Sequence, residues 1–174
     1  MKKFKKYNTK SKPKSNYEKG YVYNGETYLI IVESPSKCAK IESYLGSDYK
    51  CVATCGHLSA LKSCKNFEPI YEYAEGKSDH IYNLQKFAEN FNPENILIAT
   101  DMDREGETIA YFCWNYLLRI ENIENVKRIV FNEITQTALL NAVRSPQNIN
   151  ISLVHSQQAR QMLDVIIGYK ISPY

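Results

Sequence analysis

Three short runs of consecutive apolar residues occur along the chain, each followed by polar residues and then by helical spacing. The runs cover residues 29–32, 96–99 and 129–131. A strand with one wet face alternates apolar and polar residues, whereas a strand covered on both faces is apolar throughout. The runs therefore predict buried strands of a parallel sheet, and residues 49–54 predict a fourth strand.

Helix signals lie between these strands. Ser34 and Pro35 are typical of an N-cap and a first helical position, which predicts a helix that continues to about Leu45. In residues 78–91 the apolar positions recur on one helical face, and Pro93 then closes the segment.

Three more helices are expected in the second half of the chain. One follows Glu105, one follows Thr135, and the last covers residues 152–167 with Gly168 as its stop. Because strands and helices alternate, we predict an α/β fold with a mostly parallel four-stranded sheet flanked by helices.

The first 26 residues differ in charge from the rest of the chain. They hold eight lysines and two glutamates, a net charge of +6, whereas the whole chain carries +3 and residues 27–174 therefore carry −3. This segment has almost no aliphatic residues to offset the entropy of ordering, so we expect a basic, disordered tail. It serves either to keep the protein in solution or to bind DNA without sequence preference.

The sequence excludes a membrane span. No apolar run approaches the roughly 20 residues that span a bilayer, and no apolar stretch follows the N-terminal lysines as a secretory signal requires. We therefore expect an intracellular protein with no membrane partner.

The five cysteines are odd in number and form no CxxC pair. We expect free, reduced thiols that pack as small apolar side chains. The alternative is a zinc site formed by Cys51, Cys55, Cys64 and His57, although their spacing fits no common zinc pattern.

Acidic residues follow two of the predicted strands, at the ends where open parallel sheets bind ligands. Glu33 follows the first strand, and Asp101, Asp103 and Glu105 follow the strand at 96–99. Carboxylate oxygens suit Mg²⁺, which keeps several waters and takes further ligands from phosphate. The acidic segment contains Arg104 but no lysine, so a bound cation offsets its repulsion.

The start of a helix is an alternative explanation for some of these acidic residues, and it needs no metal. Asp103, Glu105 and Glu107 fall in a first helical turn, where the macrodipole favours acids. The turn at residues 34–37 offers free N–H groups and a lysine, a combination suited to one phosphate. His57 stands alone, and a lone histidine is more often structural than functional.

Six segments stand in order along residues 28–174. They are IVESPSK at 31–37, GHL at 56–58, FEPIYEY at 67–73 with GK at 76–77, ATDMDREGE at 99–107, RIVFNEIT at 128–135 and SQQARQMLDVIIGYKISP at 156–173. Together they resemble the motifs of type IA DNA topoisomerases, and ATDMDREGE is the most specific. The resemblance implies a Rossmann-like Toprim domain over residues 27–144 and the first segment of the topoisomerase core over residues 145–174.

The family likeness implies relaxation of negatively supercoiled DNA by breaking, passing and rejoining one strand, with Mg²⁺ and without ATP. The substrate is single-stranded or underwound DNA. The implied site residues are Glu33, Asp101, Asp103 and Glu105 for the metal, Glu33, Lys37, Asp103 and Glu105 for catalysis, and Lys37, His57, Arg104 and Arg160 for DNA.

The nucleophilic tyrosine of the family has no counterpart among the 14 tyrosines, because none precedes the Arg-Thr pair typical of it. Relatives also continue for several hundred residues beyond the point matched by Tyr174. We therefore expect an N-terminal fragment that is inactive without its C-terminal domains. The alternatives are a self-contained Toprim nuclease or RNA-processing enzyme, and a truncated relative that only binds DNA or a partner.

Overall fold

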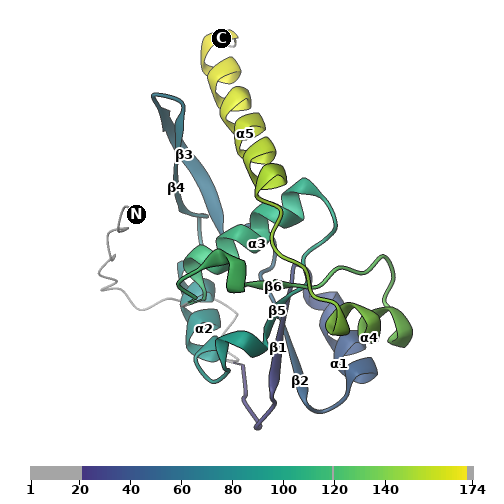
Figure 1. The fold of residues 1–174 in the computed structure, drawn as a ribbon. Coiled ribbons are helices and arrows are strands. Elements are labelled where there is room, and N and C mark those ends of the chain that lie inside the picture. The colour runs from purple at the N-terminus through teal and green to yellow at the C-terminus, as the bar shows by residue number, and fades with distance from the viewer. Residues whose placement is uncertain (1–20, 119, 172–174) are drawn as a thin grey trace.

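The computed structural model of the protein describes residues 21–118 and 120–171. A four-stranded parallel sheet lies at its centre (Figure 1). The strands follow the order β2-β1-β5-β6, and all neighbouring pairs are parallel, as predicted. Their bounds are β1 Tyr28–Val32, β2 Tyr49–Ala53, β5 Ile96–Ile98 and β6 Lys127–Arg128. Residues 1–20 of the expected tail lie outside the described residues.

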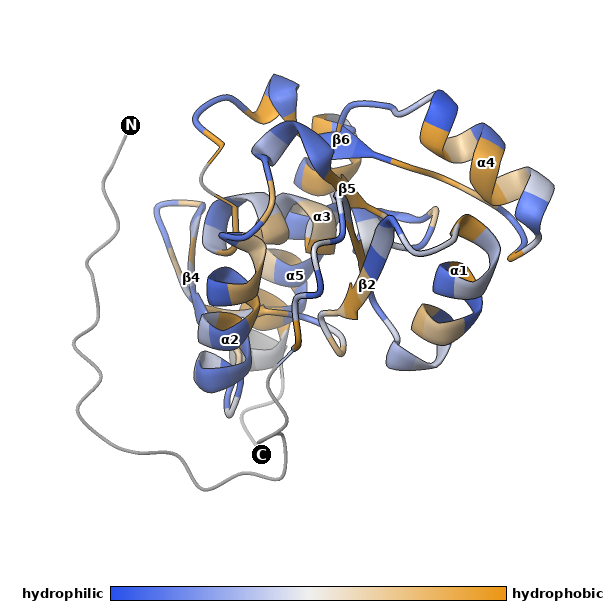
Figure 2. Ribbon diagram, turned by 90° about the horizontal axis from the view of Figure 1, so that it is seen from below, coloured by the Kyte–Doolittle hydropathy of each residue, from blue (hydrophilic) through white to orange (hydrophobic). Residues whose placement is uncertain are grey.

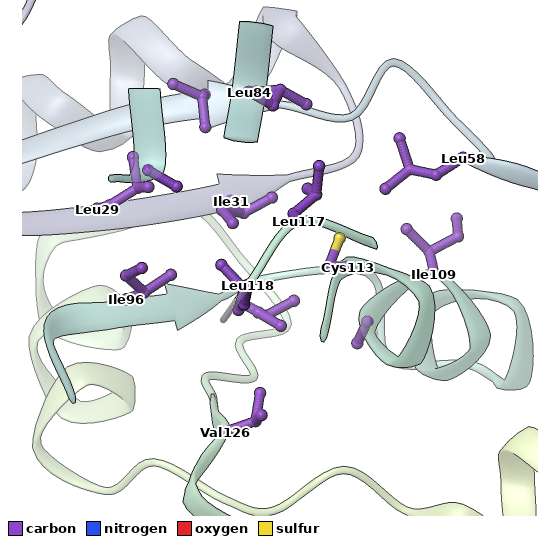
Figure 3. Packing of buried hydrophobic residues seen from close by; sticks show 14 of the residues in the cluster. Leu29, Ile31, Leu58, Leu84, Ile96, Ile109, Cys113, Leu117, Leu118 and Val126 are labelled. Atoms are coloured by element: carbon purple, nitrogen blue, oxygen red, sulfur yellow. The ribbon is translucent and has the colours of Figure 1, made fainter. Parts of the chain in front are cut away.

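The helices cover both faces of this sheet. Side chains alternate along β1, so that Leu29 and Ile31 pack toward α2 and α3, while Ile30 and Val32 pack toward α1 and α4. Figure 2 shows these helix pairs on opposite sides of the hydrophobic strands, and Figure 3 shows Leu29, Ile31 and Ile96 in the first cluster. The four helices are α1 Cys38–Leu45, α2 Ser78–Ala88, α3 Arg104–Tyr116 and α4 Gln136–Arg144. Two-sided burial explains why the strands are apolar throughout.

The strand expected at residues 129–131 is displaced toward the N-terminus. β6 comprises Lys127 and Arg128, and the Ile129 N–H donates to the Ile98 carbonyl at 2.9 Å. β5 ends at Ile98, so the residues after Ile129 have no strand beside them. The apolar run at residues 129–131 therefore reflects burial under the helices more than hydrogen bonding to a neighbouring strand.

A separate antiparallel hairpin was not predicted. It consists of β3 (Ser59–Lys65) and β4 (Glu68–Tyr73), joined by Asn66 and Phe67. Both joining residues have positive φ, 52° and 59°, as a tight two-residue hairpin turn requires. The usual signal for such a turn is Asn-Gly, and Phe67 in place of glycine hides it.

Helix α5 (Ile151–Ile171) runs through Gly168, so the prediction of a stop there was wrong. A glycine inside a helix costs about 1 kcal/mol relative to alanine but does not by itself break the hydrogen-bond ladder. The helix packs on α3 and on the hairpin, where the Tyr71 hydroxyl donates to the Gln161 side-chain oxygen at 2.9 Å. In Figure 1 the far half of α5 projects beyond the sheet, beside the hairpin.

The remaining helix predictions need only small changes at the ends. A 3₁₀ turn, Pro35–Lys37, precedes α1, and the Ser34 hydroxyl pairs with the Ser36 hydroxyl instead of capping the helix. α2 ends at Ala88 rather than at residue 91. Within the described residues, no helix is long and apolar enough to cross a membrane.

The start of α3 lies directly against the backbone that follows β5. A Cβ atom on Gly106 would lie 2.0 Å from the Asp101 carbonyl oxygen, well inside contact distance. The Gly106 N–H donates to the Asp103 carboxylate at 2.7 Å, and the Gly106 carbonyl accepts from the Thr100 hydroxyl at 2.7 Å. Glycine is therefore required for this close approach.

The start of α2 holds the loop that follows β2. The Lys77 ammonium donates to the Cys55 carbonyl at 2.6 Å, and His80 Nε2 donates to the Ala53 carbonyl at 2.9 Å. Burial lowers the pKa of His80, and the charge of Lys77 acts in the same direction. His57 lies in the same loop, two residues after Cys55.

Gly106→Ala should lower the free energy of unfolding by about 1–3 kcal/mol, the usual effect of overpacking. Gly168→Ala is the matched control, because nothing lies within 4 Å of a Cβ at that position and alanine favours a helix by about 0.5–1 kcal/mol. Urea unfolding followed by circular dichroism measures both. If the two substitutions stabilise the protein alike, the close approach of α3 is wrong.

His80 should titrate below its usual pKa of about 6.5 in the folded protein and near that value in urea. The unfolded state then binds the proton more readily, so stability is complete above about pH 6.5 and falls as the pH drops toward the folded pKa. NMR titration of the imidazole gives both pKa values. Unfolding of His80→Gln across the same pH range should show a weaker loss, and an increase in stability toward low pH would contradict this assignment.

Candidate functional site

The acidic residues lie where the strand order of the sheet reverses. From β1 the chain continues to β2 on one side, whereas β5 pairs with β1 on the other side. Glu33 follows β1 and Asp101 lies three residues after β5, so both are at the carboxyl ends of central strands. Ligands of open α/β sheets bind at such a reversal.

Glu33 connects the two strand ends. Its carboxylate accepts the backbone N–H of Asp101 at 2.8 Å. Burial raises the pKa of Glu33, and the nearby charges of Asp101 and Asp103 raise it further, against the opposing effects of that N–H and of Lys37. Glu33 therefore lies in the field of both aspartates, as the sequence predicted for acids at one edge.

Lys37 lies within this group of acids. Its ammonium forms an ion pair with the carboxylate of Asp101, and the two side chains are 28% and 54% exposed. Arg104 is thus not the sole nearby cation, because Lys37 approaches from the turn after β1. An exposed pair of this kind contributes little stability and exchanges partners readily.

Asp103 and Glu105 each form a hydrogen bond with another part of the protein. The Asp103 side chain is the N-cap of α3, which agrees with the helix-start alternative for this residue. The Glu105 carboxylate accepts from the buried amide of Gln157 on α5 at 3.5 Å. Both acids are exposed and remain open to solvent ligands.

Glu107 points into the protein and forms a buried ion pair with Arg128. Arg128 Nε donates to Glu107 Oε1 at 2.7 Å, and their side chains are 1% and 9% exposed. Arg128 also donates to Thr100 and Asp101. Glu107 is therefore neither a metal ligand nor a simple helix-start acid. Arg128 was not among the predicted site residues, and its sequence signal is a charged residue directly before the apolar run at residues 129–131.

The described residues contain no group of three His, Cys, Asp or Glu side chains arranged to hold a metal ion. The donor set nevertheless fits Mg²⁺, since the acids near Asp101 offer hard oxygen ligands. Mg²⁺ commonly takes one or two carboxylates and completes its shell with water and substrate phosphate. The arrangement is suited to an ion held jointly with a phosphate rather than to a closed protein cage.

The zinc alternative is not formed. The five cysteines are free, with Cys51 and Cys113 buried and the other three half-buried. Cys51 belongs to the apolar cluster under α1, whereas Cys64 lies on β3 and contacts the Met162 sulfur of α5 at 3.6 Å. The thiols pack within or beside apolar surroundings, as expected.

The three further DNA candidates come from separate elements. His57 lies half-buried in the loop after β2, Arg104 is the exposed first residue of α3, and Arg160 lies on α5. Arg160 Nε is 3.9 Å from the Asp164 carboxylate, and both side chains are exposed.

Comparison with known proteins identifies the fold. Residues 28–134 match the Toprim domain. The structure is also similar to full-length topoisomerase I from Thermotoga maritima, with a TM-score of 0.72 and 38% sequence identity. The similarity covers 83% of this chain and 25% of that chain, so this chain spans about a quarter of the protein that it matches. The resemblance to type IA topoisomerases is thereby confirmed, and the chain belongs to the Toprim domain family.

Proposed function

We propose that this chain is the N-terminal Toprim part of a type IA DNA topoisomerase, with residues 145–174 beginning the core domain. The full-length protein relaxes negatively supercoiled DNA by breaking, passing and rejoining one strand without ATP. The observation that carries this proposal is the meeting of Glu33, Lys37 and Asp101 at the strand reversal of a Toprim sheet. Its partners are underwound DNA and the C-terminal domains, in an intracellular setting.

Mg²⁺ is the proposed cofactor. Asp101 and Asp103 would hold the ion, and either Glu33 or Glu105 would join them as a third carboxylate only when the ion binds, since the described residues form no three-acid group. A bound Mg²⁺ would offset the repulsion among these acids and polarise phosphate oxygens. The raised pKa of Glu33 supports this reading, because burial and neighbouring acids already disfavour its negative charge.

The remaining residues act on the phosphate itself. Lys37 can exchange its exposed partner Asp101 for an oxygen of the scissile phosphate. Glu33 can hold a proton for the leaving 3′ oxygen, since its raised pKa brings it nearer the pH at which proton transfer is effective. His57, Arg104 and Arg160 contact the DNA on either side.

Replacing Asp101 and Asp103 together by asparagine should weaken Mg²⁺ binding at least about tenfold, or about 1.4 kcal/mol. Asparagine keeps the size of both side chains and the capping oxygen of Asp103. The control is Glu68→Gln with Glu75→Gln, which removes two exposed charges outside the acidic segment. Calorimetric titration with Mg²⁺, with and without a single-stranded oligonucleotide, measures the effect. Equal affinities of the two double variants would refute the site.

This chain should form no covalent adduct with DNA, because the tyrosine nucleophile belongs to another domain in our proposal. The chain is incubated with end-labelled single-stranded DNA and Mg²⁺, denatured and separated by size. Intact label that runs free of protein is the expected result. Shortened free label would favour the self-contained nuclease, and label bound to protein would indicate a complete enzyme.

A further inference from the structure

Arg128 is a fully buried arginine whose hydrogen bonds converge on the backbone of the acidic site. Its side chain lies under the segment that leads from β5 to Asp101, and the residue has a relative exposure of 0%. Nη1 donates to the Thr100 carbonyl at 2.9 Å and to the Thr100 hydroxyl at 2.7 Å, while Nη2 donates to the Asp101 carbonyl at 2.8 Å. Three acceptors on two consecutive residues thus share one guanidinium.

The pair with Glu107 supplies the opposite charge. Nε donates to Glu107 Oε1 at 2.7 Å, and Glu107 Oε2 accepts the backbone N–H of Asn150 at 3.0 Å. The Arg128 backbone also exchanges hydrogen bonds of 2.8 and 2.7 Å with Gln147. The network therefore joins the acidic segment, α3 and the chain that leads into α5.

Stability alone is a weak reason for such an arrangement. Removing two charges from water costs several kcal/mol per ion, and an apolar pair of similar volume is often as stable. A guanidinium differs from an apolar group, and from lysine, in its planar fork of five donors with fixed directions. Here the fork sets the position of two carbonyls, and the Asp101 N–H between them donates to Glu33.

We propose that Arg128 is a positioning residue for the acidic site. Its guanidinium fixes the Thr100 and Asp101 backbone, which keeps the Asp101 carboxylate beside Glu33 and Lys37. The inference rests on the proposed Mg²⁺ site, but it also makes a claim about the free protein: the Asp101 N–H should depend on Arg128 when no metal is bound.

Arg128→Lys keeps the charge and removes the fork. Without metal, hydrogen exchange measured by NMR should accelerate for the Asp101 amide at least about tenfold more than for the Ala99 amide, which is held in the sheet by the Ile31 carbonyl. The Mg²⁺ affinity should also fall about tenfold. Phe91→Ala is the control, because Phe91 is a buried residue after α2 and its truncation also destabilises the fold. It should leave the Mg²⁺ affinity unchanged and the Asp101-to-Ala99 ratio as in the wild type.

Two milder substitutions at Thr100 provide a second test if the Arg128→Lys variant does not fold. Thr100→Val removes the hydroxyl that accepts from Arg128 and donates to the Gly106 carbonyl, whereas Thr100→Ser retains both hydrogen bonds. Selective acceleration of the Asp101 amide in the valine variant, with recovery in the serine variant, supports the proposal. Uniform exchange changes in all variants would overturn it. If the wild type fails to bind Mg²⁺ while the exchange effect is present, the proposed cofactor is wrong and the positioning role of Arg128 stands.

Discussion

Concentration of negative charge at one end of a parallel sheet is the constraint on which this structure depends. Parallel strands bring their following loops to the same edge, and here those loops carry Glu33 and Asp101. Carboxylates held close together repel one another, and burial together with the charges of Asp101 and Asp103 raises the pKa of Glu33. Two groups compensate part of this charge: Lys37 pairs with Asp101, and the Gly106 N–H in the first turn of α3 donates to the Asp103 carboxylate.

The buried apolar residues on both faces of the sheet hold the strand ends, and with them the acidic residues, in fixed positions. β1 and β5 are buried on both faces, so their ends have little freedom to separate. Gly106 allows α3 to approach Asp101 more closely than any other residue would. Beneath them, the Arg128–Glu107 pair replaces water with directed hydrogen bonds. A charged surface is thus supported by a buried and closely packed base.

Local patterns predicted most of the fold, whereas contacts distant in sequence were harder to foresee. The apolar runs predicted the parallel strands, with the last one displaced, and the acids at their ends predicted the candidate site, because both signals are carried by neighbouring residues. The hairpin was missed because Asn66-Phe67 lacks the expected glycine, and α5 continues because one glycine does not end a well-packed helix. Arg128 meets Asp101 across 27 positions, a pairing that depends on strand order. Neither composition nor spacing along the chain specifies that pairing.

The start of helix α5 is held by a backbone hydrogen bond to Glu107, the buried partner of Arg128. Asn150, directly before its first residue, is bound to Glu107, and the helix then continues for 21 residues. At 1.5 Å per residue it is about 31 Å long, so a tilt of about 5° at its base displaces its far end by about 3 Å.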